Sequence, residues 1–212
     1  MNSNEAYSEF TWTTAGPANG CSGEGLANSI IELVRHMDGV KAICDLGCGN
    51  GYITTRLASL GYDLTGVDLS QSGLEIARNT NGNIHYVQAS IDSLLSSRLG
   101  NHFDLVLSSD VIEHLYRPSD LLEAARSVLK THGGLIIGTP YHGYLKNLAL
   151  ALTGKMDTHF SALHDGGHIK FFSIKTLSRL MQASGFDVLQ FTFYGRAPWL
   201  WKNMICSARK VD

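Results

Sequence analysis

The sequence has little charge, little proline and no long hydrophobic run. Charged residues make up 17% of the 212 residues and only 4 residues are proline. No apolar run reaches the roughly 18 residues that a membrane-spanning helix needs. Residues 1–15 are polar and lack a basic stretch followed by an apolar one, so no secretory signal peptide is expected. This composition is typical of a globular domain.

Basic residues are neither abundant nor clustered. The chain has 17 Lys and Arg against 19 Asp and Glu, a formal net charge of -2, and its longest basic run is Arg209-Lys210. General nucleic-acid binding requires a basic surface that neutralises phosphates. No nucleic-acid partner is therefore expected.

The four cysteines are scattered and form no Cys-x-x-Cys pair, which excludes a zinc ribbon and a dithiol redox motif. Cys44 and Cys206 lie in apolar runs and are expected to be buried thiols. Reduced thiols are typical of cytoplasmic proteins, and we expect that location.

Apolar runs alternate with helical patterns through most of the chain. The pattern predicts helices over residues 24–37, 52–60, 71–79, 91–99, 119–130 and 173–184. It predicts strands over residues 42–46, 64–67, 84–87, 103–107, 134–139, 186–194 and 203–208. This order indicates an α/β, Rossmann-like doubly wound sheet of seven strands, mostly parallel with a terminal antiparallel strand, and helices on both faces.

Two segments depart from this rhythm. Residues 1–22 are expected to form an N-terminal arm before a single domain over residues 23–212, in which residues 141–168 form a lid insertion. Segments this long without a strand are usually functional. The side chains that we expect to meet an acceptor are Tyr141, His142, Tyr144, His159 and His164.

Three glycines follow the first predicted strand, which ends at Asp45. Gly47, Gly49 and Gly51 can take positive φ and let a ligand approach the backbone, and the next helix presents its free N–H groups there. An acid beside the loop suits a ligand with a cationic amino group better than a pyrophosphate. A tight turn without a ligand is the alternative.

A second acid stands at the end of the second strand. Asp68 follows Asp45 by 23 residues, and an acid at this place can accept hydrogen bonds from both hydroxyls of a ribose. Asp68 could instead cap the following helix, although Ser70 already suits that role. The two acids and the glycines together predict a nucleoside-containing cofactor.

Four motifs now resemble those of class I S-adenosylmethionine-dependent methyltransferases, and most closely the small-molecule group with the ubiquinone-pathway O-methyltransferases. They are D-L-G-C-G-N-G, V-D-L-S, F-D-L-V-L-S-S-D-V-I-E-H-L and G-G-L-I-I-G-T-P, in that order. The resemblance implies S-adenosylmethionine as cofactor and S-adenosylhomocysteine as product. The cofactor residues that loop and resemblance together indicate are Asp45, Gly47, Cys48, Gly49, Gly51, Asp68, Leu69, Ser90, Ile91, Ser109 and Asp110.

Methyl transfer needs aligned partners and, for a hydroxyl acceptor, a base. His114, its neighbour Glu113 and the distant His168 are the expected catalytic residues. His114 could take the proton, or Glu113 and His114 could only position Asp110. The pattern Asp-x-x-Glu-His is also similar to the Glu-x-x-Glu-His of metal-dependent methyltransferases, but we expect no metal here.

A small-molecule acceptor, through a phenol or quinol hydroxyl, is the function that we predict. One alternative is a metal-assisted methyltransferase of the RNA 3′-end type, which the lack of basic surface disfavours. Another is a non-catalytic partner subunit that keeps the cofactor site. The apolar segment 144–152 and the tip 197–202 suggest a peripheral membrane contact, and the oligomeric state cannot be read from the sequence.

Overall fold

A seven-stranded sheet forms the centre of the computed structural model, which describes residues 10–18, 21–92, 94–100, 102–160, 163 and 166–211. The strand order is β3-β2-β1-β4-β5-β7-β6. The strands are β1 (Ala42–Leu46), β2 (Asp63–Asp68), β3 (His85–Gln88), β4 (Phe103–Ser109), β5 (Leu129–Pro140), β6 (Phe186–Tyr194) and β7 (Asn203–Lys210). The predicted Rossmann-like fold is thereby confirmed.

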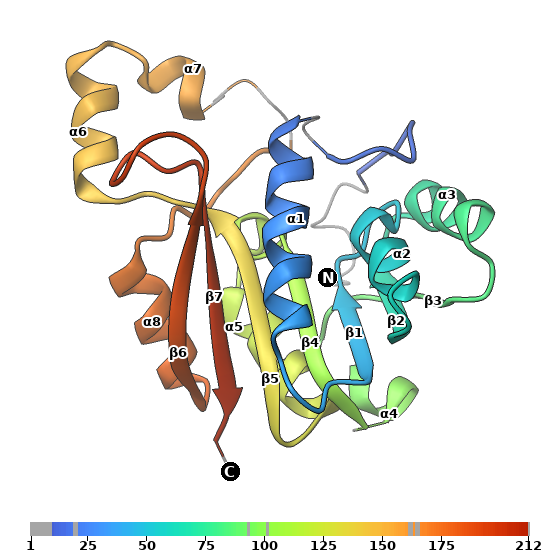
Figure 1. Cartoon of the computed structure of the whole chain (residues 1–212). Coiled ribbons are helices and arrows are strands. Elements are labelled where there is room, and N and C mark those ends of the chain that lie inside the picture. The colour runs from blue at the N-terminus through green and yellow to red at the C-terminus, as the bar shows by residue number, and fades with distance from the viewer. Residues whose placement is uncertain are drawn as a thin grey trace, which may run out of the picture.

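Helices cover both faces of the sheet (Figure 1). They are α1 (Cys21–Arg35), α2 (Tyr52–Ala58), α3 (Gln71–Thr80), α4 (Leu95–Leu99), α5 (Pro118–Val128), α6 (Tyr144–Leu152), α7 (Met156–Phe160) and α8 (Ile174–Ala183), with a 3-10 turn over Ile112–His114. Among the described residues, no helix is long and apolar enough to cross a membrane.

Each face of the sheet packs its own core. Ile43 and Ile136 lie with α1, α2 and α3, whereas Cys44 and Ile137 lie with α4, α5 and α8. All four side chains are completely buried. Both faces are apolar because successive side chains of a strand point to opposite sides, and this explains why the central strands read as continuous apolar runs.

The chain ends in a hairpin that completes the sheet. β7 runs antiparallel to both β5 and β6, so it fills the place between them and leaves β6 at the edge. β1 and β4 are parallel neighbours although they are far apart in sequence. The carboxyl ends of the parallel strands therefore meet at one edge of the sheet, where open α/β sheets bind their ligands.

Several predicted boundaries were wrong, including the following two. Residues 129 and 130 belong to β5 rather than to the preceding helix, because Leu129 pairs with Phe103 of β4. The first helix begins at residue 21, inside the segment that we expected to be arm. Tertiary pairing decided the first case, which local periodicity does not show.

Candidate cofactor and acceptor site

The glycine loop is held to the neighbouring strand by its backbone. The N–H groups of Gly47 and Cys48 donate to the carbonyl of Val67, at 2.7 and 3.0 Å. Gly47 has a φ of 80°, and a Cβ there would lie 2.3 Å from Cγ2 of Val111. Glycine is thus required by both conformation and space. The Cys48 side chain is buried in the core, so only its backbone can meet a ligand.

Asp45 lies buried directly below this loop. Its Oδ2 accepts a hydrogen bond of 2.6 Å from Oγ1 of Thr54, in α2. Burial raises the pKa of the Asp45 carboxyl to about 7, and the charge of Asp68 adds to the effect, against the hydrogen bond from Thr54. A cation bound over the loop would favour the ionised form. Asp45 is therefore suited to sense the charge of a ligand.

Asp68 joins the ends of β1 and β2. Its Oδ2 accepts from the N–H of Gly49 and its Oδ1 from the N–H of Ser70, both at 2.7 Å. A carboxylate can accept about four hydrogen bonds, so these two do not exhaust it. Ser70, not Asp68, caps α3, because its side chain accepts from the N–H of Gly73. Leu69 beside it is 44% exposed.

The N-terminal arm packs on the loop, which the sequence left open. A Cβ on Gly49 would lie 2.3 Å from Cζ2 of Trp12, so the indole ring covers this glycine. The backbone N–H of Trp12 donates to Oγ of Ser72 at 3.0 Å. Nδ2 of Asn50 donates to the carbonyls of residues 14 and 16, both at 2.7 Å. The arm is thus a wall of the candidate cofactor site.

Asp110 stands at the end of β4 in a conformation rare for its residue type. Its φ is 54°, and its N–H donates to the carbonyl of Gly138 at 2.9 Å. Nδ2 of Asn203, the first residue of β7, donates to Oδ1 at 3.4 Å. Burial raises the pKa of the Asp110 carboxyl to about 7. Backbone strain of this kind is concentrated at functional sites. No pattern in the sequence predicts that Asn203 lies here.

Ser109, Ser90 and Ile91 occupy the same edge of the sheet, after β4 and β3, and all three are partly buried. Their positions agree with the predicted line of cofactor contacts from β3 to β4.

Glu113 and His168 come together although they are 55 positions apart in the sequence. Oε1 of Glu113 lies 3.9 Å from Nε2 of His168 and has no hydrogen-bond partner among the described residues, while Oε2 accepts from Oγ1 of Thr139 at 2.9 Å. The N–H groups of residues 169 and 170 both donate to the Glu113 carbonyl, at 2.9 Å. Burial, and then the charge of Asp110, raise the pKa of Glu113 well above its usual value. These two backbone hydrogen bonds hold the chain just after the lid against the backbone of Glu113.

His114 completes the group. Its Nδ1 lies 3.0 Å from the carbonyl of Gly166, and its ring meets the His168 ring edge-on, with centroids 4.8 Å apart. One carboxylate oxygen and two ring nitrogens of Glu113, His114 and His168 lie within 4.8 Å of one another. These three side chains could act on a proton, and the same atoms are of the kind that bind Zn²⁺.

A second group of rings lies in the lid. His142, between β5 and α6, is 6% exposed, and its ring centroid is 5.4 Å from His159 and 5.0 Å from Phe171. Phe160 stacks on the same ring at 5.7 Å. Burial, and then the charge of Lys146, lower the pKa of His142 to about 4. His142 is therefore neutral at physiological pH.

The remaining lid residues take other places. Tyr141 is 5% exposed and its ring packs against Phe193 and Trp201, within the hairpin core rather than with the histidines. Tyr144 is 79% exposed on the outside of α6. His164 lies outside the described residues.

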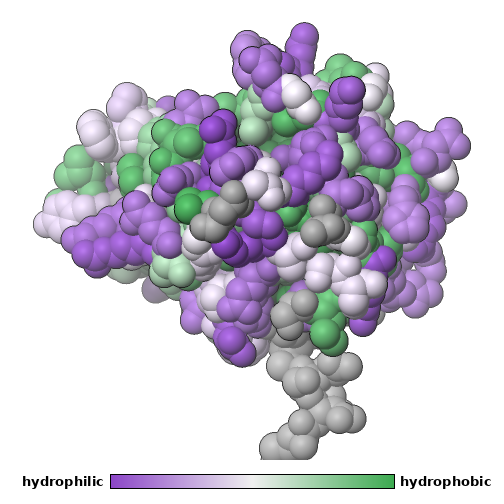
Figure 2. Space-filling model, turned by 90° about the horizontal axis from the view of Figure 1, so that it is seen from below, coloured by the Kyte–Doolittle hydropathy of each residue, from purple (hydrophilic) through white to green (hydrophobic). Residues whose placement is uncertain are grey.

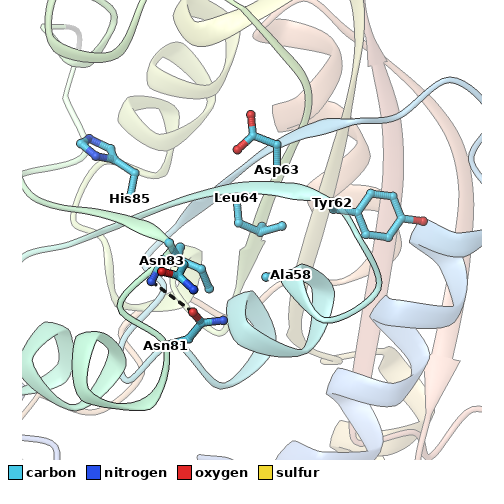
Figure 3. Close-up of a pocket in the computed structure, with 8 residues that line it drawn as sticks. Ala58, Tyr62, Asp63, Leu64, Asn81, Asn83 and His85 are labelled. Atoms are coloured by element: carbon cyan, nitrogen blue, oxygen red, sulfur yellow. Dashed lines mark hydrogen bonds between the residues drawn. The ribbon is translucent and has the colours of Figure 1, made fainter.

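A separate hollow of about 360 Å³ lies at the opposite edge of the sheet (Figure 3). The residues that line it include Asp63 and His85, the first residues of β2 and β3. Asn81 and Asn83 also line it, and the Asn83 N–H donates to Oδ1 of Asn81 at 3.2 Å. Because these are the amino ends of the strands, the hollow takes no part in the site described above.

Comparison with known proteins now places the chain. It matches the methyltransferase domain family over residues 24–191. The chain belongs to this family. Among relatives, the ubiquinone biosynthesis O-methyltransferase of Roseobacter denitrificans is 31% identical over 168 residues, covering 76% of this chain and 66% of that protein. The mitochondrial ubiquinone biosynthesis O-methyltransferase of Schizosaccharomyces pombe is 33% identical over 106 residues, 47% of this chain and 38% of that protein. The methyltransferase domain thus spans just under two thirds of the first relative and less of the second.

Solved structures agree on the fold. The magnesium protoporphyrin IX methyltransferase of Synechocystis PCC 6803 with bound SAH has a TM-score of 0.64 at 16% identity, over 87% of this chain and 81% of that one. A Burkholderia thailandensis 1,6-didemethyltoxoflavin-N1-methyltransferase, with bound 1,6-didemethyltoxoflavin and S-adenosylhomocysteine, has a TM-score of 0.66 at 17% identity, over 89% and 80%. At these identities the likeness concerns the fold.

Proposed function

We propose that the chain transfers a methyl group from S-adenosylmethionine to a hydroxyl oxygen of a small molecule, a phenol or quinol. The observation that carries the hydroxyl is the buried Glu113 carboxyl, which has an unpartnered oxygen facing His168. Such a pair can act as a general base that takes a proton from the acceptor, and a hydroxyl acceptor must lose its proton in methyl transfer. The ubiquinone biosynthesis O-methyltransferases among its relatives support the same choice.

The cofactor would lie across the carboxyl ends of β1, β2 and β4. Asp68 would accept hydrogen bonds from the ribose, and Gly47 and Gly49 would pass below the methionine part. The two acids with a pKa near 7, Asp45 and Asp110, lie on either side of the loop and would stabilise the ammonium group. Leu69, Ser90 and Ile91 would line the adenine.

The protein contributes mainly alignment and proton transfer, because the sulfonium methyl is already reactive. The acceptor hydroxyl would donate its proton to Nδ1 of His168, and Nε2 faces Glu113. S-adenosylmethionine would supply the reactive methyl group for the hydroxyl oxygen, and S-adenosylhomocysteine would be the product. His114, bonded to the lid carbonyl at Gly166, would hold the lid in place.

Incubation with S-adenosylmethionine and a panel of phenols, quinols and amines tests this function, with S-adenosylhomocysteine as the readout. Turnover with hydroxyl acceptors and none with the Asp68→Ala variant is expected. Turnover with amines alone would contradict the proposal. The same assay with a chelator, and with added Mg²⁺ or Zn²⁺, is expected to give unchanged rates. A rate that depends on the metal would instead assign Glu113, His114 and His168 as metal ligands.

A peripheral membrane contact belongs to the same proposal. The exposed apolar side chains of α6 and of the β6–β7 turn include Leu145, Leu148, Leu152 and Trp199. Figure 1 shows α6 and this turn at the same corner of the molecule, and Lys146 of α6 contacts the carbonyl of Lys202 at 3.5 Å. The opposite end, viewed in Figure 2, is mostly hydrophilic with scattered apolar patches. An apolar acceptor in a membrane would enter the site at the corner formed by α6 and the β6–β7 turn.

A further inference from the structure

A buried lysine holds the lid to the terminal hairpin. Lys146 of α6 is 2% exposed, and its Nζ donates to the carbonyl of Tyr141 at 2.6 Å and to that of Lys202 at 3.5 Å. Neither carbonyl carries a full charge. A buried ammonium without a counter-ion is costly, and proteins normally pair it with a carboxylate. The local structure gives it no such partner.

More positive charge gathers at the same place. Arg196 belongs to the β6–β7 turn, and the stem of Lys202 packs against its neighbour, since a Cβ on Gly195 would lie 3.2 Å from the Lys202 side chain. The charges of Arg196 and Lys202, after burial, lower the pKa of Lys146 to about 8. These cations therefore lie close enough to repel one another.

Acidic residues are nearly absent from both segments. Residues 141–160 contain a single acid, the exposed Asp157, and residues 195–202 contain none. Within the described part of the chain, neither Lys146 nor Arg196 forms an ion pair with a carboxylate. The excess of positive charge here contrasts with the net charge of -2 of the whole protein.

The cations lie near the rings of the lid. The His142 ring meets the His159 ring at 5.4 Å, and the charges of Lys146 and Arg196, after burial, lower the pKa of His159. Figure 1 shows α6, α7 and the β6–β7 turn at this corner.

We infer that Lys146 and Arg196 form a subsite for an oxyanion, a carboxylate or phosphate group. Lys146 supplies a fixed buried charge, and the exposed guanidinium of Arg196 makes the direct contact, for which its fork of donors is suited. The inference rests on the proposed function in one respect: the subsite is formed by the lid and the terminal hairpin, which we propose to face the acceptor. The acceptor itself would carry the anion, and a lipid headgroup is the other source of the same chemistry.

Binding of benzoate and of its neutral counterpart benzamide, measured by titration calorimetry on the full chain with S-adenosylhomocysteine present, tests the subsite without requiring turnover. We expect benzoate to bind at least tenfold more tightly than benzamide. Arg196→Gln should weaken benzoate binding at least fivefold, since glutamine is polar but carries neither the positive charge nor the fork of donors of the guanidinium. Arg98→Gln, an exposed arginine of α4, is the matched control and should change nothing.

Co-sedimentation with phosphatidylcholine vesicles, with and without phosphatidylglycerol, identifies the source of the anion. Benzoate binding that depends on Arg196 supports an anionic acceptor. Binding to the phosphatidylglycerol vesicles alone, lost in Arg196→Gln but not in Arg98→Gln, supports a headgroup in the same subsite. If neither benzoate nor the anionic vesicles respond to Arg196→Gln, the inference is overturned, whether or not the protein proves to transfer methyl groups.

Discussion

Asp45 shows how one buried residue can link cofactor binding to pH. Burial holds its pKa at about 7, so half of the carboxyls are protonated at neutral pH. The ammonium group of the cofactor would favour the ionised form, and binding below pH 7 must therefore release a proton. Each pH unit below the pKa weakens such binding by up to about tenfold.

The variant Asp45→Asn should flatten this dependence. We expect the affinity for S-adenosylhomocysteine, measured by calorimetry, to rise about tenfold in the unmodified protein from pH 6 to pH 7.5. The variant should bind more weakly and gain about threefold or less, with Asp110 supplying the remaining slope. Equal slopes in both proteins would contradict the role of Asp45.

Folding gives a control for the same variant. A raised pKa means that the fold prefers neutral Asp45, so its contribution to stability is complete below about pH 4 and is lost as the pH rises through about 7. Asparagine can still accept the hydrogen bond from Thr54. The variant should therefore melt no lower than the unmodified protein at pH 8.

The proposed base, His168, predicts a different signature. His168→Asn should lower kcat for a phenol by about 100-fold at pH 7, within the usual range for general-base catalysis. The loss should shrink as the pH approaches the phenol's own pKa of about 10, because the phenolate needs no base. The affinity for S-adenosylhomocysteine should stay the same. A deficit that is constant over pH would indicate a structural role.

Sequence reasoning succeeded for residues whose role depends on their neighbours in the chain. The glycine loop follows directly on Asp45, and the capping role of Ser70 is set by α3. It missed Asn203, which meets Asp110 only because β7 inserts beside β5. It also could not separate Tyr141 from His142, since the direction of each side chain depends on the hairpin that packs over them.

Among the elements, the N-terminal arm makes the clearest contribution to the site that the sequence did not assign. Oγ of Ser70 donates to the carbonyl of Phe10 at 2.6 Å, and the Trp12 ring covers Gly49 and Gly73. The arm therefore closes one side of the glycine loop. Its contacts in the described part of the chain are with the glycine loop, including the Asn50 side chain, and with the start of α3.

Replacing Trp12 should thus affect the cofactor and not the acceptor. We expect Trp12→Ala to weaken S-adenosylhomocysteine binding by about tenfold, a loss of about 1.4 kcal/mol. The KM of the acceptor at saturating cofactor should not change. Trp199→Ala, an exposed tryptophan of the β6–β7 turn, is the control and should leave the cofactor affinity as it is. Unaltered binding in Trp12→Ala would show that the arm only packs on the loop.

The elements themselves were mostly predictable. Strand β6 matches its predicted bounds. α3 differs from its predicted bounds by one residue at one end and α8 by one residue at each end, because strong periodicity and capping residues mark them. α7 and the path of the lid were not predicted. The lid and the residues that follow it form contacts with the hairpin and with Glu113, which are distant in sequence, and no local pattern encodes these contacts.

At the scale of the whole molecule, the two halves of the sheet have different proposed roles, one in cofactor binding and one in acceptor binding. The proposed cofactor residues come from β1 to β4, whereas the proposed acceptor side consists of the lid and the β6–β7 hairpin. Strand β7 lies between β5 and β6, and its first residue, Asn203, donates a hydrogen bond to Asp110. The hairpin therefore contacts the cofactor side at the proposed point of methyl transfer. The lid can therefore vary with the acceptor without disturbing the cofactor loop.

The proposed membrane contact belongs to the whole molecule as well, because it decides how the protein would approach a lipid-like acceptor. On α6, Leu148 and Leu152 are exposed, whereas Leu150 is 7% exposed and packs inward. Of these three leucines, only Leu148 and Leu152 can enter a bilayer. Each would gain on the order of 1.5–3 kcal/mol when buried there.

Vesicle co-sedimentation should resolve this contact. The unmodified protein is expected to pellet with vesicles that contain phosphatidylglycerol, and the double variant Leu148→Ser, Leu152→Ser should lower the bound fraction at least tenfold, about 1.4 kcal/mol or more. Leu94→Ser removes a leucine that is 62% exposed far from the lid, and it should not alter binding. If the unmodified protein stays in the supernatant, α6 serves only as a lid, and its exposed leucines must then be covered by the acceptor or by another protein.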